Sequence, residues 1–94
     1  MKELLPNTVE ASGEKHLPAV TVEDGAIHVN VGSVDHPMLP EHFIEWVYVQ
    51  TENGGQRKVL KPGDEPHVTF SLGDDKAVAV YAYCNIHGLW KTEI

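Results

Sequence analysis

The stretch AVTVEDGAIHVNV, residues 19–31, is the strongest indicator of the fold of this chain. Apolar and polar residues alternate from Ile27 to Val31, which is the period-two pattern of a strand with one buried face. Residues 19–22 are rich in β-branched side chains, and Asp24-Gly25 favours the positive φ angles of a two-residue turn. The stretch therefore predicts an antiparallel hairpin.

The same kind of pattern continues outward from this hairpin. Strand-like runs separated by turns rich in glycine, asparagine and aspartate occupy residues 42–51, 57–60, 67–72, 76–84 and 89–93. No window of helical length places apolar residues three and four positions apart. The sequence therefore predicts an all-β protein, an immunoglobulin-like sandwich or barrel of about seven strands.

Two of these runs carry more detailed expectations. The run 42–51 has apolar residues on both faces, so we expect both faces to be covered. One face of the run 76–84 is expected to carry four apolar residues: Val78, Val80, Ala82 and Cys84.

Length and charge limit what the chain can do. Its 94 residues support one domain, and we expect residues 1–12 to form a loosely held arm. Fourteen acidic and seven basic residues give a net charge of −7, which argues against nucleic acid and anionic membrane surfaces as partners. The longest apolar stretch, 77–84, is too short for a membrane helix. A lone cysteine and an N-terminus without the apolar run of a signal peptide predict a cytoplasmic protein.

Histidine is the residue type in excess. The chain has six histidines, and each neutral imidazole can bind a metal. Four of them, with the single cysteine, stand at strand ends or in loops, where side chains can converge on one point: His16, His36, His42, His87 and Cys84. The spacing of Cys84 and His87 lets a thiolate and an imidazole reach the same ion. His28, on an alternating strand, and His67, at a strand start, are interpreted as surface residues instead.

Four strings stand in the chain in this order: Glu14-Lys15-His16-x-Pro18, Gly32-Ser33-Val34-x-His36-Pro37-Met38, His42-x-Ile44-Glu45-Trp46 and Cys84-Asn85-Ile86-His87-Gly88-Leu89-Trp90. Together they resemble the superoxide reductases, the neelaredoxin and desulfoferrodoxin family. The resemblance implies one non-haem iron per chain, held by four equatorial histidines and one axial cysteine: His16, His36, His42, His87 and Cys84. No second cysteine group stands near the N-terminus, so the short neelaredoxin type, with a single domain over residues 1–94, fits better.

The resemblance also implies an activity and partners. Superoxide would be reduced by one electron to hydrogen peroxide, and the electron would come from rubredoxin or a similar small iron protein. Relatives of the short type form dimers or tetramers. Lys15 is expected to attract superoxide at short range, where its field outweighs the screened negative surface. Glu14 resembles a residue that binds Fe(III) in the resting state.

The sequence departs from the family pattern at Asp35, where the family commonly has a proline. We expect this exchange to loosen the loop that orients His36 without removing a ligand. Trp46, Trp90, Tyr81 and Tyr83 are interpreted as packing residues and not as redox relays.

Two other metal sites compete with this interpretation. A cupredoxin-like electron-transfer protein also combines cysteine, histidine and a β-sandwich, but no methionine follows Cys84, and the chain has only Met1 and Met38. A structural zinc site would leave one of the five candidate ligands unused, because zinc takes four in such sites.

Overall fold

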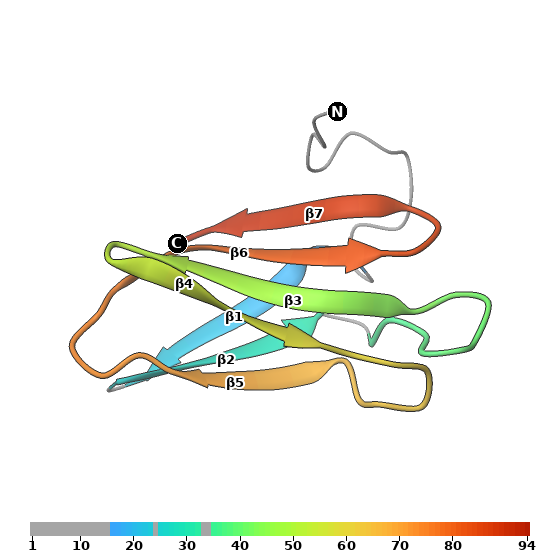
Figure 1. Cartoon of the computed structure of the whole chain (residues 1–94), viewed down its shortest axis with the longest axis horizontal. Helices are drawn as coiled ribbons and strands as arrows, with labels where there is room; N and C mark the ends of the chain where they lie inside the picture. Colours follow the sequence, from blue (N-terminus) through green and yellow to red (C-terminus); the bar gives the residue numbers. More distant parts are fainter. Residues whose placement is uncertain (1–15, 24, 33–34) are drawn as a thin grey trace.

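Seven strands make up the part of the chain that the computed structural model describes, residues 16–23, 25–32 and 35–94. They form two antiparallel sheets (Figure 1). The three-stranded sheet runs in the order β1 (Pro18–Glu23), β2 (Ala26–Val31), β5 (His67–Ser71). The four-stranded sheet runs in the order β4 (Gly54–Val59), β3 (Ile44–Thr51), β6 (Ala77–Cys84), β7 (Gly88–Glu93).

The hairpin predicted over residues 19–31 is confirmed. Strands β1 and β2 pair from Pro18 with Val31 to Glu23 with Ala26, which leaves a two-residue turn. Gly25 in that turn has a φ of 71°, the left-handed conformation that glycine adopts without steric cost. Its neighbour Asp24 lies outside the described residues.

The inner faces of the two sheets form one core. The sheets pack face to face and do not close on each other, so the fold is the sandwich and not the barrel. The side chains that alternate inward on the strands fill the space between the sheets, as the period-two pattern predicts. The core consists of Ile27, Val29, Val31, Ile44, Val47, Val49, Val68, Phe70, Val80, Ala82 and Cys84.

The expectation that Val78 shares the core face of β6 is wrong. Gln50 of β3 pairs with Ala79, whereas Thr51 pairs with Ala77, so Val78 is the extra residue of a β-bulge. Its side chain is 40% exposed. Beyond the bulge, Val80, Ala82 and Cys84 point into the core as expected.

The expectation that β3 is covered on both faces is also wrong. Its inner residues are buried, but Trp46 and Tyr48 on the outer face are only half-buried. Trp46 stacks on Tyr83 of β6 at a centroid distance of 5.6 Å, and Tyr48 lies 6.0 Å from Tyr81. The apolar residues on this face thus form an aromatic stripe across two strands.

Two strands begin two or three residues away from their expected starts. Strand β3 begins at Ile44 and not at residue 42, because His42 pairs instead with Leu39 across a tight turn. Strand β4 begins at Gly54, three residues before the expected start at 57, because both turn glycines pair with the end of β3. His42 is therefore a loop residue, and its side chain is not required to pack within a strand.

Within residues 16–23, 25–32 and 35–94, no helix has the length and apolar character needed to cross a bilayer.

Candidate metal centre

One end of the sandwich collects the candidate ligands. His16 lies two residues before the start of β1, and His36 and His42 lie in the segment that connects β2 to β3. Cys84 is the last residue of β6, and His87 lies in the turn to β7. Figure 1 shows that the loop before β3 and the turn between β6 and β7 lie at the same end, on the right of the view. The topology therefore brings together residues far apart in the sequence.

The four imidazole rings lie at the corners of a square. Neighbouring ring centroids are 4.6 Å apart for His16 and His36, 4.7 Å for His36 and His42, 5.0 Å for His42 and His87, and 4.8 Å for His87 and His16. The centroids of His16 and His42, across the square, are 6.3 Å apart. Neighbouring rings meet edge to face, at angles between 76° and 84°. The four rings are therefore arranged around a common axis, each nearly perpendicular to its two neighbours.

The ligand atoms of the rings face the middle of the square. Nε2 of His16 lies 3.1 Å from Nε2 of His36 and 3.0 Å from Nδ1 of His87. Ligand atoms of His16, His36, His42 and Cys84 all lie within 4.8 Å of one another. An octahedral ion with metal–nitrogen bonds of about 2.1 Å separates adjacent nitrogens by about 3.0 Å. The spacing therefore fits adjacent ligands of a single ion.

Cys84 approaches the square from the core side. Its side chain is fully buried, and its Sγ lies 3.9 Å from Nδ1 of His87. The backbone N–H of His87 donates a hydrogen bond to that sulfur at 3.4 Å. Hydrogen bonds of this kind orient a ligating thiolate and moderate its electron donation. The short turn after Cys84 thus places both the imidazole and the backbone amide of His87 close to the sulfur.

His36 is fixed in the neutral form with Nε2 available to a metal. Its Nδ1 donates a hydrogen bond to the carbonyl oxygen of Pro37 at 2.7 Å, so the proton sits on Nδ1. Its side chain is buried, and burial lowers the pKa of His36 from 6.5 to about 4, although the Pro37 carbonyl favours the protonated form. At neutral pH the ring carries no charge.

Trp90 supports another ligand. Its ring stacks on His16 with a centroid distance of 4.9 Å and an interplanar angle of 26°, and the side chain is buried. The packing role expected for Trp90 is confirmed. The contact with His16 could not be predicted from the sequence, because the two residues lie far apart in the chain and meet only in the folded structure.

Asp35 makes side-chain contacts at the start of the loop of His36, and the loosening expected of its exchange for proline stays a prediction. Its carboxylate accepts a hydrogen bond from Asn30 Nδ2 at 3.1 Å and lies 3.1 Å from Nε2 of His67. The hydrogen bonds from His67 and Asn30 lower the pKa of the Asp35 carboxyl. Asp35 therefore ties the start of this loop to strands β2 and β5.

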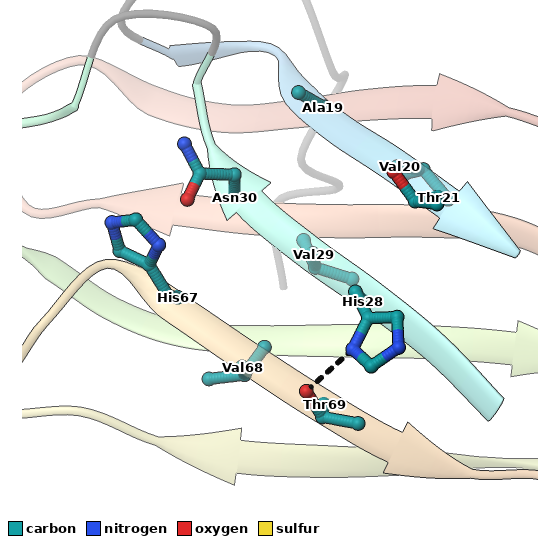
Figure 2. Close-up of a pocket in the computed structure, with 9 residues that line it drawn as sticks. All are labelled: Ala19, Val20, Thr21, His28, Val29, Asn30, His67, Val68 and Thr69. Carbon is teal, nitrogen blue, oxygen red and sulfur yellow. Dashed lines mark hydrogen bonds between the residues drawn. The ribbon is translucent and has the colours of Figure 1, made fainter. Parts of the chain in front are cut away.

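His28 and His67 lie apart from the candidate centre, as predicted. Figure 2 shows both on the outer face of the three-stranded sheet, lining a shallow trough across β1, β2 and β5. His28 is hydrogen-bonded to Thr69 Oγ1 at 2.9 Å and lies 3.3 Å from Glu23, and His67 contacts Asp35. Glu14 and Lys15 fall outside the described residues.

Fold and site together define an all-β protein with a candidate metal site lined by imidazoles and a thiol. The family model of desulfoferrodoxin matches residues 8–93. The chain therefore belongs to the desulfoferrodoxin family.

Known relatives agree with this membership. A desulfoferrodoxin homologue of Archaeoglobus fulgidus is 46% identical over 92 residues, covering 98% of this chain and 73% of the relative. A superoxide reductase of Pyrococcus horikoshii is 38% identical, covering 87% of each chain. The crystal structure of the superoxide reductase from Treponema pallidum has a TM-score of 0.91 and 45% identity, and covers 96% of this chain and 75% of its own.

Proposed function

We propose that this protein is a superoxide reductase: superoxide, one electron and two protons give hydrogen peroxide. The observation that carries the proposal is the square of four imidazoles with the Cys84 sulfur beside it. The related superoxide reductases of Pyrococcus and Treponema support it.

The residues present fit one iron ion per chain. Nε2 of His16 and His36 and Nδ1 of His87 are spaced as adjacent ligands, and the ligand atoms of His42 and Cys84 complete the group. Imidazole and thiolate together suit iron, zinc and copper. Five donors exceed the four of a structural zinc site, which favours iron.

Copper of the cupredoxin kind is less well supported. Among the described residues, the methionine is Met38. Its Sδ accepts a hydrogen bond from the backbone N–H of Ile44 at 3.4 Å. That sulfur serves the backbone of the loop, whereas a blue-copper site needs a weak axial ligand such as methionine.

Iron held here would supply the single electron by passing from Fe(II) to Fe(III). The residues of the chain set the conditions for that transfer. Neutral imidazoles leave a local positive charge that attracts an anion, and His36 keeps its neutral form because of burial. The His87 amide holds the thiolate of Cys84 in place.

The activity is tested on protein purified without added metal. Elemental analysis should find iron, and pulse radiolysis of the reduced protein should give one hydrogen peroxide for each superoxide consumed. His42→Ala should lower both the iron content and the rate of superoxide reduction, whereas His28→Ala, which removes a histidine from the outer face of β2, should leave them unchanged. Copper or zinc in place of iron, or one hydrogen peroxide for every two superoxides, would contradict the proposal.

Lys15 is proposed to guide superoxide, because it adjoins His16 in the chain. Lys15→Ala should slow the bimolecular reaction with superoxide and weaken its dependence on ionic strength. Lys76→Ala is the matched control, since it removes the same charge before β6, at the end opposite Cys84. Equal rates for the two variants would show that Lys15 has no special role.

Glu14 is proposed as a ligand of the oxidised iron only. Its replacement in Glu14→Ala should leave the rate of superoxide reduction nearly intact while opening Fe(III) to cyanide or azide. An unchanged affinity for these anions would argue against the role.

We further propose rubredoxin or a similar small iron protein as the electron donor, a cytoplasmic location and a dimeric or tetrameric assembly. The half-buried aromatic stripe on the outer face of β3 and β6 supports assembly, because burying its exposed apolar surface against a second copy is favourable. The stripe consists of Trp46, Tyr48, Tyr81 and Tyr83. Stopped-flow mixing with reduced rubredoxin and light scattering of the purified protein test the donor and the assembly. A monomer at micromolar concentration would contradict the latter.

A further inference from the structure

Asn85 connects the two segments that carry His42 and the Cys84–His87 pair. Its side-chain Oδ1 accepts a hydrogen bond from the backbone N–H of Phe43 at 2.9 Å, and its Nδ2 donates to the carbonyl oxygen of Glu41 at 3.2 Å. Its own backbone N–H donates to the carbonyl oxygen of Phe43 at 3.1 Å. One residue therefore makes three hydrogen bonds to the residues on either side of His42.

The side-chain bonds differ in effect from the backbone bond. The backbone bond alone fixes the distance between the two segments at Phe43. The two side-chain bonds hold the backbone at Glu41 and at Phe43, on both sides of His42. They therefore also fix the direction of the Cα–Cβ bond of His42. The turn from Leu39 to His42 is also held at its base, by two backbone hydrogen bonds of 2.9 and 3.0 Å between these two residues.

We propose that Asn85 is a positioning residue, which aims His42 at the metal and holds it at a set distance from Cys84. The inference rests on the proposed metal site and extends it to a residue that touches no metal. Residues that orient ligands in this way typically change metal affinity 10- to 100-fold when they are removed.

A purely structural role would have a different signature. Both side-chain bonds of Asn85 are exposed, so water can replace them when the side chain is removed. The stability of the metal-free protein should therefore change little in Asn85→Ala. The contribution of these two hydrogen bonds should appear only in the metal affinity, because only then must His42 bind the same ion as the other ligands.

The test measures Co(II) binding to the metal-free protein by its absorption bands, which report the thiolate and the coordination geometry without need of activity. Asn85→Ala should bind Co(II) about 10-fold or more weakly, with altered bands. Asn85→Asp keeps an acceptor for Phe43 but loses the donor to Glu41, so its loss should be intermediate. Asn53→Ala is the control, because it removes one exposed side-chain hydrogen bond, from Asn53 Nδ2 to Asp75 at 3.1 Å, in the turn between β3 and β4.

A double-mutant cycle separates positioning of His42 from general damage. In the His42→Ala background, Asn85→Ala should have no further effect on Co(II) affinity, whereas in the His36→Ala background its effect should persist. Thermal unfolding of each metal-free variant checks folding, and if Asn85→Ala does not fold, Asn85→Asp carries the comparison.

Two results would overturn the inference: Co(II) affinity and bands of the Asn85 variants equal to those of Asn53→Ala, or equal losses in the two histidine backgrounds. Failure of the parent protein to bind any metal would instead refute the proposed site itself.

Discussion

Three candidate ligands are held by contacts with groups that are not themselves proposed to bind the metal. Pro37 fixes the proton of His36 on Nδ1, the Trp90 ring stacks on His16, and the His87 amide reaches the sulfur of Cys84. Contacts of this kind reduce the reorganisation needed when an ion binds. The individual ligand is thus prepared before the ion arrives.

Replacing the sulfur tests the proposed ligand set most directly. Cys84→Ser should abolish the visible thiolate-to-Fe(III) charge-transfer band of the oxidised protein, because the sequence offers no second thiol. Absorption spectra of the two oxidised proteins at equal iron content provide the measurement. A band that survives the substitution would remove Cys84 from the coordination of the iron.

Burial of His36 makes the metal-free protein sensitive to acid. Its pKa is 6.5 in an unfolded chain and about 4 in the folded one, so between these pH values the unfolded chain binds a proton that the folded chain does not. The free energy of unfolding should therefore fall by roughly 1–3 kcal/mol as the pH drops from 6.5 to 4, with no effect of this group above that range.

Urea unfolding of the metal-free protein at several pH values measures this loss. His36→Gln should remove part of the slope between pH 6.5 and 4, whereas His28→Gln, on the outer face of β2, should retain it. Identical slopes in the two variants would show that His36 titrates normally.

Residue types and spacing predicted which side chains gather, but not how each is held. Loop positions and the Cys84-x-x-His87 spacing marked these side chains as candidates, and the family resemblance implied that they form one ligand set. The tautomer of His36 depends on the carbonyl of the next residue, and the support of His16 depends on Trp90, 74 positions later in the sequence. Such contacts leave no local pattern in the sequence from which they could be predicted.

At the scale of elements, β7 is tied to the start of β1 beside the centre. Thr92 Oγ1 donates a hydrogen bond to the carbonyl oxygen of Pro18 at 2.7 Å, and Pro18 lies two residues after His16. The bond joins the two sheets through a side chain, because Thr92 belongs to the four-stranded sheet and Pro18 to the three-stranded one.

Loss of that bond should destabilise the sandwich. Thr92→Val keeps the shape of the side chain but leaves the carbonyl of the buried Pro18 without this donor, so the free energy of unfolding should fall by about 1 kcal/mol. Chemical denaturation measures the change. Thr21→Val, on the exposed outer face of β1, is the control and should have little effect. A loss no larger than the control's would show that the bond contributes nothing net.

Strand pattern predicted the elements well and their irregularities poorly. Alternation and turn residues located all seven strands of the described chain within three residues at each boundary. The bulge at Val78 was missed, because an extra residue shifts the alternation without changing the residue types. A second register shift lies between Ile44 and Trp46, beside the candidate ligands, and it too has no signature in the sequence.

At the scale of the whole molecule, the proposed ion would join both sheets and so add to their cohesion. His16 and His36 adjoin strands of the three-stranded sheet, while Cys84 and His87 belong to the β6–β7 hairpin of the other. Binding to the folded state alone, at 100 times the dissociation constant, adds about 2.7 kcal/mol to stability. Removing the metal with a chelator should therefore lower Tm by at least about 10 °C.

Calorimetry before and after chelation measures this shift, and readdition of Fe(II) under anaerobic conditions should reverse it. Cys84→Ser, which weakens the site, should show a smaller shift. Equal Tm values with and without metal would mean that the ion does not link the sheets.

The sequence separation of the ligands bears on how a cell could make this protein safely. His16 and His87 meet across 71 positions, and β3 to β6 must be in place before they can do so. Contacts this distant form late in folding. A chain synthesised only to a point before residue 84 would therefore lack Cys84 and His87 of the proposed site. Loading with iron would wait for synthesis of the β6–β7 hairpin.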